Sequence, residues 1–157
     1  MAQVTYAQYR KQKQEGVNAL PLFFAFSNEQ FEKAMQERGL TINDTDKIYR
    51  LGNTGGFYLK KDAPVIRAYF NGEDHLAEYM QDYDFAVEAF LYEMNNHEYA
   101  INYQGDWDVC SVFARQALEY GEAKTYQDYL KEAGLEHAIG AYRAALKKHY
   151  KEAEKWA

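Results

Sequence analysis

The chain of 157 residues is 47% hydrophobic and 17% aromatic, which excludes a disordered protein and predicts a packed domain. Its net charge of −6 disfavours nucleic-acid binding, and its single cysteine, Cys110, excludes an internal disulfide and an all-cysteine metal site. We find neither a signal peptide nor a membrane-spanning stretch of about 18 apolar residues, so we expect a soluble cytoplasmic protein.

The negative charge is concentrated in the middle of the chain. Residues 68–114 contain ten Asp or Glu and no Lys or Arg, whereas the flanking segments carry net charges of +3 (residues 1–67) and +1 (residues 115–157). A segment of this kind repels nucleic acid and attracts basic surfaces over long distances. The charge pattern therefore favours a protein that meets a cationic partner.

The N-terminal part of the chain predicts two helices separated by a strand. Thr5 is a suitable N-cap for the first helix, which Gly16 would end. The apolar run 21–26 predicts a buried strand. Ser27 and Gln30 form the capping-box pattern that begins a second helix.

The next part of the chain predicts a hairpin followed by helices and a further strand. Residues 47–52 and 57–61 flank a glycine-rich turn and predict two antiparallel strands. Asp62 is expected to cap a helix, and the pattern then stays helical to about residue 96, with an interruption at residues 71–72 and a break near residues 81–83. Residues 98–104 predict another strand.

The C-terminal part of the chain predicts only helices. Asp106 is expected to cap a helix that runs to Leu118, Thr125 begins a short helix, and residues 135–156 carry one apolar stripe at helical spacing. The whole pattern predicts an α+β fold, in which a short antiparallel sheet is packed by about seven helices. We expect a single domain, with a mixed core (residues 1–120) and a helical C-terminal extension (residues 121–157).

The acidic segment is the strongest candidate for a binding surface, and the alternative is an ordinary solvated helix face that lacks basic residues. Asp84, Glu88 and Tyr92 are spaced i, i+4, i+8 and share one stripe of a helix. The predicted partner-binding residues are Glu73, Asp74, Glu78, Tyr79, Asp82, Tyr83, Asp84, Glu88 and Tyr92. We expect that neutralising Asp82, Asp84 and Glu88 together weakens partner binding and leaves the fold intact.

Other kinds of site receive less support from the sequence. The candidates for a metal site are His75, Glu93, His97, Glu98 and Cys110; Glu93 and His97 are spaced i, i+4, and with Glu98 they are the set that a metal-dependent enzyme would use. Cys110 lies in an apolar run and is interpreted as a core residue and not as a nucleophile. We therefore expect no catalytic residue, no bound metal and no cofactor. The apolar stripe of residues 135–156 leaves a homodimer open as an alternative.

Three segments carry a resemblance to a known family: "ALPLFFAF", "GGFYLKKDA" and "NHEY". Over about residues 17–105 the chain resembles a family of small uncharacterised proteins of bacteriophages and mobile elements. Acidic proteins of such elements, among them anti-CRISPR and antirestriction proteins, inhibit nucleases by imitating nucleic acid. The resemblance thus implies a non-enzymatic inhibitor in the cytoplasm of a bacterial host, bound to a basic nucleic-acid-binding protein such as a CRISPR nuclease.

Overall fold

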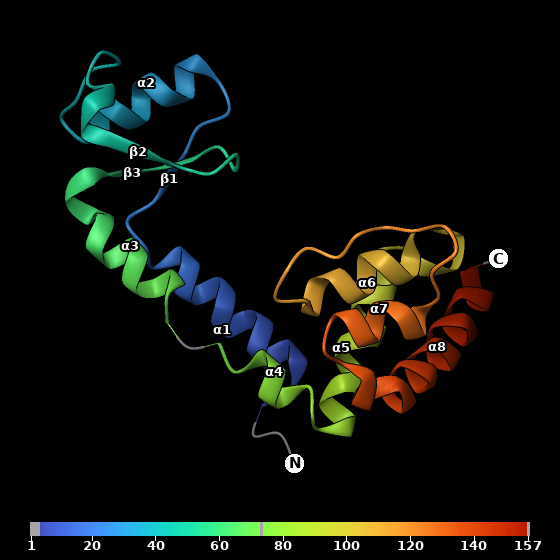
Figure 1. The fold of residues 1–157 in the computed structure, drawn as a ribbon. Helices are drawn as coiled ribbons and strands as arrows, with labels where there is room; N and C mark the ends of the chain where they lie inside the picture. The colour runs from blue at the N-terminus through green and yellow to red at the C-terminus, as the bar shows by residue number, and fades with distance from the viewer. Residues whose placement is uncertain (1–3, 73, 157) are drawn as a thin grey trace. The chain divides into compact units, whose positions relative to one another are not determined.

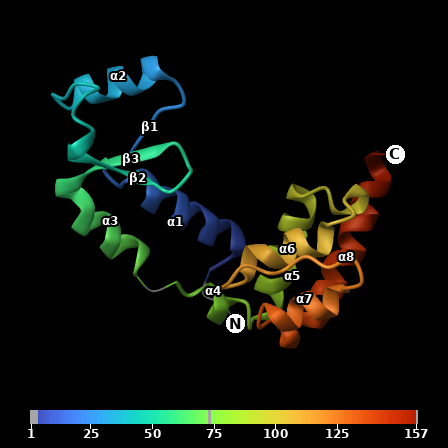
Figure 2. The same cartoon turned by 45° about the horizontal axis from the view of Figure 1, so that its top comes forward.

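A computed structural model describes residues 4–72 and 74–156, which form two compact units (Figures 1 and 2). We call residues 4–10 and 74–156 the helical unit and residues 11–72 the sheet unit, and we describe each by itself. The division falls near residues 10 and 73, whereas the sequence placed the start of a helical extension at residue 121. Both units together make an α+β fold, as predicted.

The sheet unit contains a three-stranded antiparallel sheet with strand order β1-β3-β2. Its elements are the end of α1 (Tyr6–Asn18), β1 (Phe23–Phe24), α2 (Asn28–Glu37), β2 (Ile48–Leu51), β3 (Gly56–Leu59) and α3 (Ala63–Phe70). Strands β2 and β3 form the predicted hairpin, in which Tyr49 pairs with Tyr58. The turn between them uses Gly52 and Gly55 at positive φ (54° and 79°), a region that glycine adopts without strain.

Helix α2 covers one face of this sheet (Figure 1). Met35 of α2 packs against Phe23 of β1 and Ile48 of β2, and these three side chains are buried. The helix begins as predicted, because Ser27 Oγ accepts a hydrogen bond from Gln30 N at 3.2 Å. A small apolar core and one side-chain cap therefore hold α2 on the sheet.

Helix α1 begins as predicted but does not end at Gly16. Thr5 Oγ1 accepts from Gln8 N at 3.1 Å, and Thr5 N donates back to Gln8 Oε1 at 2.9 Å, which is a capping box. The helix continues to Asn18. Gly16 serves packing instead, since a Cβ atom there would lie 2.7 Å from the hydroxyl oxygen of Tyr69 on α3.

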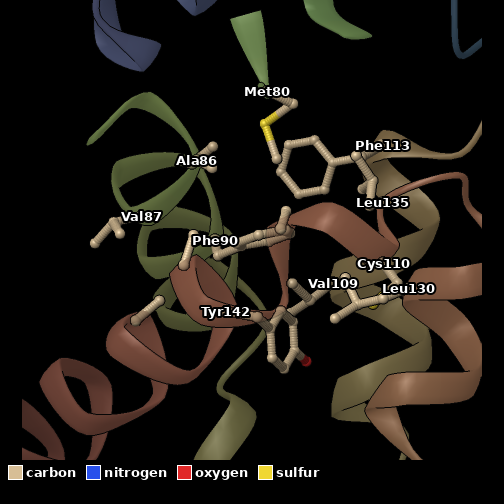
Figure 3. Packing of buried hydrophobic residues seen from close by; sticks show 14 of the residues in the cluster. Met80, Ala86, Val87, Phe90, Val109, Cys110, Phe113, Leu130, Leu135 and Tyr142 are labelled. Atoms are coloured by element: carbon tan, nitrogen blue, oxygen red, sulfur yellow. The ribbon is translucent and has the colours of Figure 1, made fainter. Parts of the chain in front are cut away.

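The helical unit is built around α5 (Tyr83–Asn96), which is buried along most of its circumference. The other helices are α4 (Leu76–Tyr79), α6 (Gly105–Phe113), α7 (Tyr126–Glu132) and α8 (Ile139–Ala153). Figure 3 shows Phe90 of α5 between Phe113 of α6 and Tyr142 of α8, at ring-centroid distances of 5.3 and 5.0 Å. Alanines on the facing sides of α5 and α8 let the two helices approach closely.

Three further predictions of secondary structure are wrong. The strand expected at 98–104 is a 3₁₀ turn at Tyr99–Ile101, and the helix expected to run to Leu118 ends at Phe113. The final helix begins at Ile139 and not at residue 135, because Gly134 (φ 77°) closes α7 and the next N–H turns back to the carbonyl of Leu130 at 2.7 Å. The described sheet consequently has three strands and not four.

Candidate functional site

Two of the predicted binding residues, Asp82 and Glu88, accept hydrogen bonds from backbone N–H groups at helix N-termini. Asp82 caps α5 by accepting a hydrogen bond from Phe85 N at 3.0 Å. Glu88 accepts hydrogen bonds from Tyr6 N and Ala7 N, both at 3.1 Å, and so satisfies the first two N–H groups of α1. Neutralising Asp82 and Glu88 would therefore alter two helix ends as well as the surface charge, so the expectation that the fold stays intact needs a separate stability measurement.

Asp74 and Tyr79 are also engaged within the helical unit. Asp74 Oδ1 accepts from Leu76 N at 2.9 Å at the start of α4 and from the Tyr9 hydroxyl at 3.1 Å. The Tyr79 ring lies 6.3 Å from the Tyr9 ring and 5.4 Å from the Phe85 ring. Contacts within the helical unit therefore account for the presence of Asp74 and Tyr79.

Tyr92 of α5 packs against residues of α1. Its ring centroid is 5.8 Å from that of Tyr6, and the guanidinium carbon of Arg10 lies 3.7 Å from the Tyr92 ring centroid. The last contact has cation–π geometry, which favours a fixed position for the arginine. The predicted stripe of Asp84, Glu88 and Tyr92 is therefore largely occupied by the N-terminal end of α1.

Three predicted residues stay exposed around the link between α4 and α5. Glu78 lies 3.3 Å from His75, Tyr83 is 58% exposed, and Asp84 is the second residue of α5. We call Glu78, Tyr83 and Asp84 the acidic junction. Glu73, the remaining predicted residue, lies outside the described residues. Of the nine partner-binding residues predicted from the sequence, the acidic junction contains these three.

The metal-binding interpretation rested on Glu93, His97 and Glu98. Glu93 is buried; it accepts a hydrogen bond from the Tyr6 hydroxyl at 2.8 Å and lies 3.4 Å from His97 Nε2. Burial, followed by this hydrogen bond, raises the pKa of Tyr6. Within residues 4–72 and 74–156 no three His, Cys, Asp or Glu side chains are grouped as metal ligands. The Glu93–His97 pair lies beside the buried Tyr6, and Glu98 points to solvent.

Asp106 is half-buried and accepts two tyrosine hydrogen bonds that the sequence did not reveal. It was expected to be the N-cap of α6, but Gln104 is at that position. Asp106 Oδ1 instead accepts hydrogen bonds from the hydroxyls of Tyr99 and, at 2.7 Å, of Tyr142. Burial raises the pKa of both tyrosines, and it raises the pKa of the neighbouring Cys110 to about 12. A thiol of this kind stays protonated, as expected for a core residue.

His149 is a second buried polar residue, with only 1% of its side chain exposed. Its Nε2 accepts from Ala100 N at 3.0 Å and its Nδ1 lies 2.7 Å from Asn95 Oδ1, so the neutral ring carries its proton on Nδ1. Burial lowers its pKa. The spacing of Tyr142, Ala145 and His149 (i, i+3, i+7) was the available signal that this histidine faces the core.

The turn before α6 presents two large apolar side chains to solvent. Ile101 is 82% exposed and Tyr103 is 87% exposed. The turn itself is fixed, because Asn102 Nδ2 donates to His97 O at 3.1 Å and to Asp108 Oδ2 at 2.7 Å. A rigid turn with exposed apolar tips is typical of a contact surface.

Helix α8 directs its apolar stripe toward α5. The buried side chains of this stripe are Ala141, Tyr142, Ala145 and His149. The exposed side of α8 includes Lys147, Lys148 and Lys151. The surface proposed from the sequence for a homodimer is therefore occupied within the same chain.

The fold defines the class of the molecule: a small α+β protein with a three-stranded antiparallel sheet and a long C-terminal helix. A model of a family of unknown function, DUF7659, matches residues 5–143, and the chain belongs to this family. The match agrees with the resemblance to an uncharacterised family and extends beyond residues 17–105, while phage origin and inhibitor class stay predictions.

No curated protein and no solved structure matches the chain. A search of the described helices finds none with the length and apolar character needed to cross a lipid bilayer.

Proposed function

We propose that this protein is a non-enzymatic binding protein whose acidic junction docks on the basic, nucleic-acid-binding surface of a partner protein, such as a CRISPR nuclease. The carboxylates of Glu78 and Asp84 would take the positions of phosphate groups beside lysine and arginine side chains. Tyr83 would add a large contact area between them. The protein would thus inhibit its partner by competing with nucleic acid.

The exposure of the junction carries this proposal. The side chains of Asp82 and Glu88 are hydrogen-bonded to the N-termini of helices. Tyr83, in contrast, is 58% exposed, and the exposed carboxylates Glu78 and Asp84 lie on either side of the α4–α5 link. No lysine or arginine occurs between Arg67 and Arg115 to neutralise these charges. Local charge of one sign with an aromatic centre suits a cationic protein surface.

The interior of the helical unit supports a non-enzymatic role. The buried Glu93 and the half-buried Asp106 already accept hydrogen bonds from tyrosine hydroxyls: Glu93 from Tyr6, and Asp106 from Tyr99 and Tyr142. A catalytic acid or base needs access to a substrate proton, and these hydrogen bonds already occupy Glu93 Oε1 and Asp106 Oδ1. They stabilise the fold and leave binding to the surface.

A displacement experiment tests the proposal. A purified nuclease is loaded with a fluorescent oligonucleotide, and the anisotropy is followed as this protein is added at several salt concentrations. We expect displacement that weakens as salt rises. The double variant E78Q/D84N should weaken displacement about tenfold and flatten its salt dependence, because each charge pair is worth roughly 0.5–1 kcal/mol.

The control is E32Q/E37Q, which removes two exposed charges from α2 of the sheet unit. It changes the net charge by the same amount and should leave displacement unaltered. Equal losses in both double variants would show that only net charge matters, and an unaltered E78Q/D84N variant would exclude the junction. Failure to displace the oligonucleotide from any nuclease in a panel of CRISPR type would refute the inhibitor function.

A homodimer through residues 135–156 is the second candidate from the sequence. Its apolar stripe already packs on α5, and the lysines on the outer side of α8 would repel their copies. Sedimentation at two concentrations separates the two functions. A tight dimer without displacement activity would favour the second.

A further inference from the structure

The sheet unit contains a hollow of about 540 Å³ on the α2 side of its sheet. Its apolar walls are Phe26, Phe31, Ile48 and Phe57, and its polar groups include Thr45 and Arg50. Small-molecule sites typically have volumes of about 300–1,000 Å³, apolar and aromatic walls and a few polar groups. The size and composition of the hollow match this description.

The aromatic walls are held in place before any ligand arrives. The rings of Phe31 and Phe57 lie 5.2 Å apart at 56°. Phe26 is 76% exposed, yet its N–H donates to Gln30 Oε1 at 2.8 Å and its ring lies against Gly55, where an added Cβ atom would be 2.5 Å from a ring carbon. Phe26 is thus an exposed ring in a fixed position, which lowers the entropic cost of binding.

Arg50 gives the hollow its charge. It is the only charged side chain among the described residues that line the hollow, and it lies opposite Phe57 in the β2–β3 ladder. Its guanidinium carbon is 5.9 Å from the Phe57 ring centroid. Across the described residues no carboxylate forms an ion pair with Arg50, so its charge is available to a ligand.

We propose that this hollow binds a small organic acid with an aromatic ring. The ring would stack on Phe26 and Phe57, and the carboxylate would accept hydrogen bonds from Arg50, whose planar guanidinium suits a carboxylate. Thr45 supplies a further hydrogen-bonding group at the rim. This site lies in the sheet unit, goes beyond the docking function of the acidic junction and does not depend on it.

The experiment is an NMR titration of the full ¹⁵N-labelled chain with 1-naphthoate, with its neutral counterpart 1-naphthamide and with acetate. We expect saturable shifts with naphthoate that are confined to the amides of residues around the hollow. Naphthamide should bind about tenfold more weakly because it lacks the charge, and acetate should not saturate because it lacks the ring. These three titrations need only the unaltered protein.

Two variants assign the roles of the wall and the charge. Arg50→Gln should weaken naphthoate binding about tenfold, leave naphthamide binding unchanged and so abolish the preference for the acid. Phe26→Ala should weaken both ligands by a similar factor, also about tenfold. The matched controls are Arg67→Gln and Phe70→Ala, which alter exposed residues of α3 outside the hollow and should change neither affinity.

Three results would overturn the proposal. Naphthoate could cause no saturable shift at millimolar concentration, or shifts spread over both units. The unaltered protein could bind acid and amide equally. Arg50→Gln could weaken both ligands by the same factor, which would make Arg50 a structural residue and not the anion-binding group.

Discussion

The two units of the chain use their side chains in opposite ways. The helical unit buries eighteen apolar residues in one cluster and turns several polar groups inward, each with a partner. The sheet unit buries a cluster of only three and leaves Phe24, Phe26 and Tyr49 exposed. Of these three rings only Phe26 lines the hollow, so it is the exposed ring that the proposed ligand site accounts for.

The difference also changes how acidic residues should be interpreted. In the helical unit, a carboxylate that the sequence shows without a nearby cation can be bound by backbone N–H groups or by tyrosine hydroxyls. Lysine and arginine are therefore not the only partners that relieve negative charge. The lack of cations in residues 68–114 reflects these internal partners together with the exposed acidic junction.

The largest expected effect is on the free energy of unfolding, and it compares the same substitution, Phe to Ala, in the two units. Phe90→Ala removes a fully buried ring of the helical unit and should lower the free energy of unfolding by about 4 kcal/mol. Phe26→Ala removes an exposed ring of the sheet unit and should change it by less than about 0.5 kcal/mol. Urea denaturation followed by circular dichroism measures both. Similar losses would show that Phe26 belongs to a core after all.

The next largest effect is also on the free energy of unfolding, and it compares a hydrogen-bonded carboxylate of α5, Glu88, with an exposed one, Asp84. Glu88→Gln should cost about 1 kcal/mol, because a single amide oxygen replaces the two that accept from Tyr6 N and Ala7 N. Asp84→Asn removes the same charge from α5 and should cost less than about 0.5 kcal/mol.

Hydrogen exchange at the two amides of α1 gives the local measurement. Exchange should quicken in the Glu88 variant only. Equal exchange in both variants would mean that Glu88 does not protect the N–H groups of Tyr6 and Ala7.

The smallest effect concerns pH and again distinguishes the units, since all four histidines lie in the helical unit. Burial holds the pKa of His149 below its unfolded value of about 6.5. The unfolded chain therefore binds a proton that the folded chain refuses, and stability should fall as pH drops from 7 towards 5. Protonation would also place a hydrogen on Nε2, opposite the N–H of Ala100.

Thermal unfolding at pH 7, 6 and 5 measures this slope. The variant His149→Gln cannot titrate and should show a flatter dependence, although it is less stable at pH 7 because a buried hydrogen-bonded ring is lost. His137→Gln, at an exposed position of the same unit, is the control and should keep the slope of the unaltered protein.

Elements with a local cause could be predicted from the sequence. The Ser27 cap, the Thr5 cap and the glycine-rich turn at residues 53–56 act over three or four residues, and the structure has each of them. The Gln30 side chain accepts from Phe26 N and not from Ser27 N, so the predicted capping box is only half formed. The α+β class follows from these signals together. The predicted start of α5 was also close, because Asp82 is a side-chain cap.

Residues 98–104 were assigned wrongly because their alternation of large and polar residues imitates a strand. The segment is held as a turn by partners that are distant in sequence: His149 accepts from Ala100 N, and Asp106 binds the Tyr99 hydroxyl. Glu98 takes a left-handed conformation (φ 51°), which sequence patterns do not predict for a glutamate.

The candidate site could be predicted only in part for the same reason. The pattern located the acidic segment correctly, but Glu88 and Asp82 look the same in the sequence as Glu78 and Asp84. Which carboxylate meets a helix end and which meets solvent depends on tertiary packing. The hollow beside Arg50 is likewise lined by residues of α2, β2 and β3 and of the links between them, so no short sequence motif predicts it.

The bond between Glu88 and the start of α1 has a consequence for the order of events during synthesis. Glu88 follows Tyr6 by 82 residues, so at about 5–20 residues per second it is added roughly 4–16 s after the helix that it caps. Throughout that interval the first turn of α1 lacks the acceptor of two N–H groups. The beginning of the protein can therefore reach its final structure only after more than half of the chain has been made.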